Sequence, residues 1–203
     1  MTDTLISSPV AHTEPELTNT GASNQKVSMW LFLASDCLLF GALISAFLLY
    51  RNRPNQIGPS RHDVFSIPYT SVSSFILLMS SLTMVLALSN IRRGDIQRFR
   101  LWALATALLG ATFIGGQIFE FTSFVHKGLK VSTNLFGSSF YVLTGFHGAH
   151  VTVGIIMLLT LVIRSLQGRL GKDQSETVEI IGLYWHFVDV VWIVIFTVVY
   201  LIP

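Results

Sequence analysis

Polar and ionisable side chains inside the most apolar runs of this 203-residue chain are the features that could carry chemistry. A charged group at mid-membrane depth costs roughly 2.5–3.5 kcal/mol on insertion scales. Such a group is therefore expected to find a partner, to stay neutral or to serve a function. Three pairs are spaced i,i+3, which predicts that both members share one helix face. The set consists of Asp36, Gln117 with Glu120, His147 with His150, and His186 with Asp189.

Metal or haem ligation is the first chemistry that three histidines allow. Transmembrane haem proteins commonly use histidines on two facing helices, which His147 or His150 together with His186 could imitate. Two histidines one turn apart cannot, however, ligate opposite faces of one haem. Membrane di-iron enzymes of the desaturase type need many more histidines than three. A haem-binding protein therefore stays an alternative, and we assign no metal ligand.

Proton transfer is the second chemistry, and a purely structural network is the third. Asp36 lies near the middle of the first apolar run with no obvious local partner, and desolvation favours the neutral form of such a carboxyl. An acid–histidine relay would suit a proton-translocating protein, yet five spans without broken helices or an inverted repeat make a poor transporter. In a structural subunit, the same polar groups would satisfy one another and fix helix register.

Five long apolar runs must position these residues. A hydrocarbon core of ~30 Å needs ~20 helical residues, so each run is long enough to cross it. Only 12% of the residues are charged and 51% are apolar, whereas a soluble domain is about 25% charged. We predict an all-α membrane protein with a five-transmembrane-helix bundle in residues 28–203. The runs are Ser28–Tyr50, Pro68–Asn90, Leu101–Val125, Gly137–Ile163 and Ile180–Leu201.

Small residues recur along three of these runs. Because lipid tails are as apolar as leucine, membrane helices associate through close packing and hydrogen bonds. The serines of the second run, Gly110 and Gly115 in the third, and Gly154 in the fourth therefore predict close helix contacts. Glycine is also common in membrane helices, so any single one can simply reflect composition.

The ends of the runs predict the orientation of the chain. Residues 1–27 are polar with no basic region before an apolar core, so we expect a flexible tail rather than a signal peptide. Eight Lys and Arg residues lie on the same predicted side of the membrane as the tail, against five on the other side. This bias predicts a cytoplasmic N-terminus and an external C-terminus. A net charge of +2 offers no basic face for nucleic acid, and the single Cys37 can form no internal disulfide. The opposite side holds Arg51, Arg53, Arg61, Lys127 and Lys130.

Four motifs resemble those of subunit III of the haem–copper terminal oxidases. They follow the family's order and spacing from about Met29 to the C-terminus, which makes the resemblance specific. The motifs are SDCLLF (Ser35–Phe40), QIFEF (Gln117–Phe121), FGSSFYVLTGFHGAHVTVG (Phe136–Gly154) and LYWHFVDVVWIVIF (Leu183–Phe196).

The resemblance implies a subunit without a redox centre. In this family, haem and copper sit in subunits I and II, and subunit III supports proton-pumping reduction of O2 to water. It does so by stabilising subunit I, sustaining proton uptake and binding phospholipid. Asp36 matches the family's membrane-embedded carboxylate, and no catalytic residue is expected here. The buried polar network would comprise Gln117, Glu120, His147, His150, His186 and Asp189.

Partners and location follow from the same resemblance. We expect subunit I as the main contact, subunit II and a small subunit IV as further partners, and membrane lipids, in the bacterial cytoplasmic (inner) membrane. The motif TGFHG favours cytochrome c as electron donor, while SDCLLF and the ending FTVVYLIP favour quinol. We favour cytochrome c and keep a quinol oxidase as the alternative.

Two departures from the family pattern affect what can be carried over. Many family members have seven spans, and five resemble the short bacterial form, which lacks the first two helices that partly wall the family's lipid cleft. Aspartate at position 36 replaces a frequent glutamate and has a shorter reach.

Overall fold

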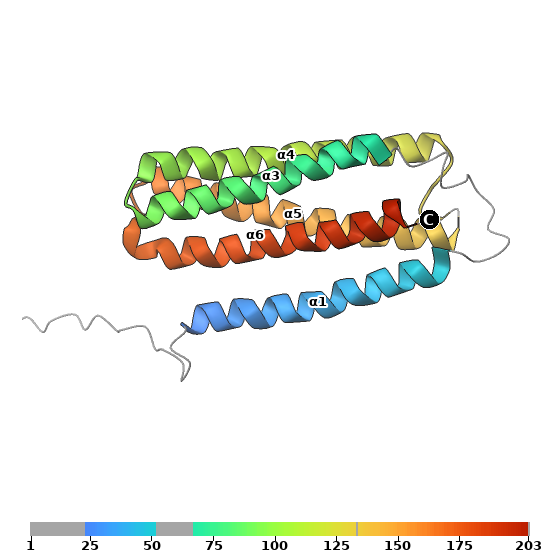
Figure 1. The fold of residues 1–203 in the computed structure, drawn as a ribbon, viewed down its shortest axis with the longest axis horizontal. Coiled ribbons are helices and arrows are strands. Elements are labelled where there is room, and N and C mark those ends of the chain that lie inside the picture. Colours follow the sequence, from blue (N-terminus) through green and yellow to red (C-terminus); the bar gives the residue numbers. More distant parts are fainter. Residues whose placement is uncertain (1–22, 52–66, 133, 203) are drawn as a thin grey trace, which may run out of the picture.

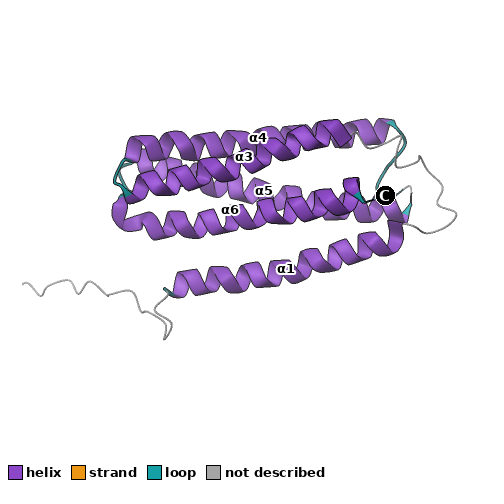
Figure 2. Cartoon of the chain, in the orientation of Figure 1, coloured by secondary structure: helices purple, strands orange, loops and turns teal. Residues whose placement is uncertain are grey.

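The computed structural model describes residues 23–51, 67–132 and 134–202. Within these ranges, five helices are long and apolar enough to cross a membrane, which confirms the predicted all-α, five-span fold. Figure 2 shows that helices joined by short turns make up nearly all of the described chain. The elements are α1 (Asn24–Arg51), α3 (Ile67–Arg92), α4 (Ile96–His126), α5 (Leu135–Leu166), a 3-10 turn η1 (Lys172–Gln174), α6 (Ser175–Phe196) and a π-helical end η2 (Thr197–Leu201).

The helices run past the predicted apolar runs at several ends. α4 begins at Ile96 and α6 at Ser175, five residues before each predicted run. The reason is that hydropathy marks only the part of a helix that lies in hydrocarbon, whereas polar residues can continue the helix into the interface. Residues 1–22 of the predicted tail, and Arg53 and Arg61 of the charge count, lie outside the described residues.

Four helices form an antiparallel bundle, and the fifth packs on its outside. α3 contacts α4 and α6, and α5 contacts the same two helices from the other side. α1 packs mainly against α5 and α6 and lies apart from the α3–α4 pair in Figure 1. α6 therefore has three helical neighbours, which explains why it holds the largest buried side chains.

Trp185 of α6 lies at the centre of the four-helix bundle. Its Nε1 donates a hydrogen bond to Ser80 Oγ of α3 at 2.9 Å. A Cβ added to Gly110 of α4 would lie 2.5 Å from the indole, and one added to Gly154 of α5 would lie 2.8 Å from it. The predicted close packing is therefore confirmed at these two glycines, whereas Gly115 faces open space and reflects composition.

Charged residues tie the helix ends together outside the apolar layer. Glu179 of α6 pairs with Lys26 of α1 at 2.5 Å and with Arg92 of α3 at 2.7 Å. At the other end, Arg51 is only 7% exposed and donates to the carbonyl oxygens of Val198, at 3.0 Å, and Ile202. Because the last carbonyls of a helix have no partner within it, this guanidinium holds the C-terminal turn onto α1.

Replacing Arg51 with methionine should loosen the C-terminal turn. Hydrogen bonds to charged groups contribute ~1.5–3 kcal/mol, so residues 197–202 should exchange their amide hydrogens at least tenfold faster. Hydrogen–deuterium exchange with mass spectrometry measures this in the detergent-solubilised protein. Arg92→Met is the matched control, because Arg92 is 54% exposed in its side chain and forms a surface ion pair. Equal exchange of residues 197–202 in both variants would contradict the anchoring role.

Candidate functional site

Asp36 of α1 is paired with His150 of α5. The Asp36 Oδ2 atom lies 3.4 Å from His150 Nε2, a long contact between two largely buried side chains. The other ring nitrogen, Nδ1, lies 2.7 Å from the backbone oxygen of Phe146. Asp36 was expected to have no local partner, and its contact with His150 comes from a helix that only the fold brings alongside.

The hydrogen-bonding geometry of this pair limits where its hydrogens can lie. A carbonyl oxygen can only accept, so His150 Nδ1 must carry a hydrogen, and its Nε2 is the atom that faces Asp36. At 3.4 Å the two atoms are too far apart for a strong hydrogen bond, and Asp36 Oδ2 has no hydrogen-bond partner among the described residues.

Ser81 of α3 joins His186 and Asp189 of α6. Its hydroxyl lies 2.9 Å from His186 Nδ1 and donates a hydrogen bond to Asp189 Oδ2. The predicted sharing of one helix face by His186 and Asp189 is confirmed. Ser81 belongs to this cluster as well, although nothing in the sequence distinguishes it from the other serines of the span.

His147 lies in the fully buried centre of the bundle. Its Nε2 is 3.2 Å from the backbone oxygen of Val188, and its ring packs against Trp192 and Phe113. His147 therefore contacts α4 and α6, whereas His150 contacts α1, so the two do not act as one pair. Residues three apart differ by about 60° around a helix, which is enough to separate them when three helices surround it.

Gln117 and Glu120 of α4 also contact different neighbours. Gln117 Nε2 donates to the backbone oxygen of Thr144 at 2.8 Å, and Thr70 Oγ1 of α3 donates to Glu120 at 2.7 Å. Glu120 also hydrogen-bonds Tyr200 in η2. The expected single network is thus several separate clusters. Among the described residues, an acid and a histidine of this set meet directly only at Asp36 and His150, because hydroxyl and backbone groups lie closer to the others.

The geometry gives no shared centre to these groups. Across the three described segments of the chain, no three His, Cys, Asp or Glu side chains converge in a way that could hold a metal ion. What the arrangement can do is lock neighbouring helices in register.

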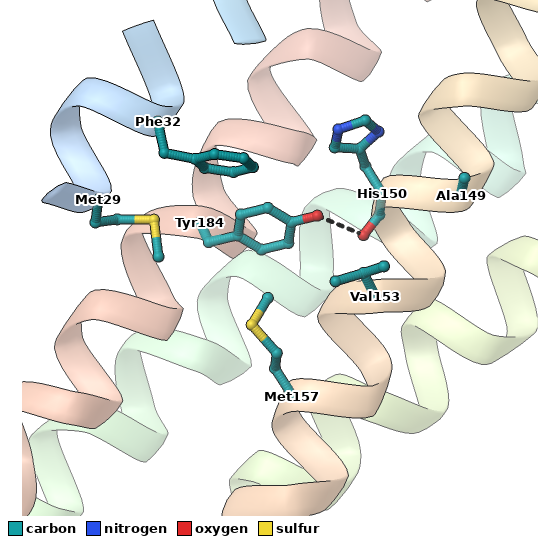
Figure 3. Close-up of a pocket in the computed structure, with 7 residues that line it drawn as sticks. All are labelled: Met29, Phe32, Ala149, His150, Val153, Met157 and Tyr184. Carbon is teal, nitrogen blue, oxygen red and sulfur yellow. Dashed lines mark hydrogen bonds between the residues drawn. The ribbon is translucent and has the colours of Figure 1, made fainter. Parts of the chain in front are cut away.

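An apolar cavity of about 270 Å³ adjoins the Asp36–His150 pair. Figure 3 shows the ring of Tyr184 beside Phe32, with its hydroxyl directed at the backbone oxygen of His150, to which it donates at 2.9 Å. The cavity lies between α1, α5 and α6 and is lined by Met29, Phe32, Ala149, His150, Val153, Met157 and Tyr184.

Comparison with known proteins identifies the family. The family model described as cytochrome c oxidase subunit III matches residues 11–202, almost the whole chain. The chain belongs to the cytochrome c oxidase subunit III family. The resemblance of the four motifs is thereby confirmed.

Relatives of the subunit III family include both donor types. Cytochrome c oxidase subunit 3 of Bacillus sp. (strain PS3) is 42% identical over 178 residues, 88% of this chain and 86% of the relative. Quinol oxidase subunit 3 of Bacillus subtilis (strain 168) is 40% identical over 175 residues, 86% of this chain and 85% of the relative. Probable quinol oxidase subunit 3 of Staphylococcus saprophyticus is 38% identical over 177 residues, 87% and 88% of the two chains. Overall identity therefore does not separate the donors.

Proposed function

We propose that this chain is the subunit III of a proton-pumping haem–copper respiratory oxidase that reduces O2 to water, with no redox centre of its own. The observation that carries the proposal is family membership over residues 11–202 on a five-span multi-pass membrane fold. Haem and copper then belong to subunits I and II, with subunit I as the main contact and a small subunit IV as a further partner. The location is the bacterial cytoplasmic membrane, with the N-terminus in the cytoplasm.

The enclosure of two of the three imidazoles supports a chain without haem. His147 is enclosed by aromatic rings and a backbone carbonyl, His150 by Asp36 and Phe146, and His186 contacts Ser81. Binding iron through either of the first two would break a buried contact. We expect the subunit freed of its partners to show no reduced-minus-oxidised change in the Soret region. A Soret change that follows the chain through purification would instead favour the haem-binding alternative.

The electron donor is proposed to be cytochrome c. The TGFHG motif favours this donor, while SDCLLF and the quinol oxidase relatives keep quinol as the second candidate. Activity of the purified complex with reduced cytochrome c and with a short-chain quinol separates the two.

We propose that part of an acyl chain of a bound phospholipid lies in the cavity beside Tyr184. Its lining is apolar except for the His150 ring, so an acyl chain lying between α1, α5 and α6 would cover surface that the bundle leaves open. Val153→Trp should fill the cavity. Lipid that stays bound to the wild-type complex after delipidation, but not to the Val153→Trp complex, would support this site.

Co-purification tests the proposed function directly. The tagged chain, solubilised in mild detergent, should bring down subunits that carry haem and copper, identified by mass spectrometry and visible spectroscopy. The preparation should consume O2 with one of the two donors. A chain recovered alone, or with proteins that hold no haem, would refute the assignment.

A further inference from the structure

His186 has a ring nitrogen that this chain leaves unused. Nδ1 is engaged by Ser81, but Nε2 meets no hydrogen-bond partner among residues 23–51, 67–132 and 134–202. Fully buried polar atoms without a partner in those ranges include His147 Nδ1 and Asp189 Oδ1, but Nε2 is not among them. Because Nε2 has no partner and is not fully buried, it must be accessible at the outer surface of the bundle, where the partly buried His186 lies.

The depth of this nitrogen restricts what can bind it. His186 is the fifteenth residue of the 30-residue segment Lys172–Leu201, and Ser81 is the fifteenth of the 26 residues of α3. Counted from Glu179, whose charge lies outside the apolar layer, His186 is about two helical turns, or ~10 Å, further along α6 and so lies inside the hydrocarbon. Acyl chains there offer no hydrogen-bonding group.

The surface around His186 is apolar and exposed. Leu78 and Val85 flank Ser81 at i−3 and i+4 along α3. Val190 and Ile193 follow His186 at i+4 and i+7 along α6. Residues at these spacings share one face of a helix, and α3 and α6 are in contact. We name this surface the α3–α6 face; its members are Leu78, Ser81, Val85, His186, Val190 and Ile193.

We propose that the α3–α6 face docks a transmembrane helix of a partner subunit, and that this helix presents a hydrogen-bonding side chain to His186 Nε2. The proposal rests on the assignment of the chain to an oxidase complex. An acyl chain could cover the apolar residues of the face but would leave the nitrogen unpaired in hydrocarbon. A helix carrying one polar side chain covers both, which is how membrane helices associate.

The hydrogen bonds of Ser81 indicate which chemistry the partner supplies. Ser81 has one hydroxyl hydrogen and donates it to Asp189, so the contact with His186 runs from Nδ1–H to Ser81 Oγ. A neutral imidazole then has only a lone pair on Nε2. The partner side chain is therefore a donor, such as a hydroxyl, an amide or an indole N–H.

Two isosteric substitutions separate docking from internal packing. Glutamine places its amide near the position of Nε2, whereas asparagine places its amide near Nδ1 and keeps the contact with Ser81. In a detergent titration of the holo-oxidase, His186→Asn and His186→Leu should lose the chain about three- to tenfold more readily than wild type. His186→Gln should stay within about twofold. Asparagine retained as well as glutamine, or better, would overturn the proposal.

Photo-cross-linking gives a readout that does not depend on altering His186. A benzophenone amino acid at Val190, on the α3–α6 face, is compared with one at Ile118 of α4, since these residues are 58% and 61% exposed. Irradiation of the holo-oxidase should yield several-fold more adduct with another subunit from position 190. Equal or lower yield from position 190 would overturn the proposal. If the tagged wild-type chain brings down no haem-containing oxidase, the proposed function fails instead, so the two failures are distinguishable.

Discussion

Gly110→Val is expected to destabilise the bundle by about 3 kcal/mol, at the upper end of the usual cost of overpacking. The new side chain would enter space that Trp185 occupies, since even a Cβ would lie 2.5 Å from the indole. Trp185 is 1% exposed and cannot withdraw, because Gly154 contacts its other side and Ser80 holds its Nε1. The midpoint of thermal unfolding of the detergent-solubilised protein, followed by size-exclusion chromatography, measures the loss.

Gly115→Val provides the matched control for this prediction. Gly115 lies in the same helix, and a Cβ there would meet nothing within 4 Å. Both substitutions change helix propensity equally, so the difference between them isolates the contact with Trp185. Gly115→Val should shift stability by less than ~0.5 kcal/mol. Similar midpoints for the two variants would show that the indole is not held between α4 and α5.

Asp36→Ala is expected to leave the oxidase assembled but to shorten its working lifetime or slow its proton uptake several-fold. Without the carboxyl, His150 keeps its contact with Phe146 but loses the only acid that faces its ring among the described residues. Contacts of α1 with α5 and α6 remain, which is why assembly should persist. The number of turnovers before inactivation, and proton uptake by the complex in vesicles, measure the effect.

Asp36→Asn separates a proton-holding role from a packing role. The asparagine amide can donate to His150 Nε2 and keep the contact, but it cannot release a proton. If the pair works through its proton, the asparagine variant should resemble Asp36→Ala in lifetime and proton uptake while unfolding near the wild-type midpoint. Wild-type turnover and pumping in Asp36→Asn would leave Asp36 with a structural role only.

The polar clusters show where reasoning from the sequence stops. Spacing along one helix correctly placed His186 and Asp189 on a common face, because that geometry is local. The same rule misled for His147 and His150, which lie on a helix with several neighbours and contact different ones. Thr70 and Ser81 were missed as partners of Glu120 and of the His186 pair. Their hydropathy does not distinguish these two residues from the other serines and threonines of α3.

The sequence by itself determined the membrane class, the five spans and the family. Each of the three follows from local composition or from motifs read in order, and none depends on which helix lies beside which. The tertiary structure alone decided that Asp36 meets His150, that two glycines enclose Trp185, and that His186 keeps one nitrogen at the outer surface. These are contacts between residues far apart in the chain. They are set by the packing of whole helices, because complementary surfaces and small residues determine which helices lie side by side. No single segment therefore encodes them.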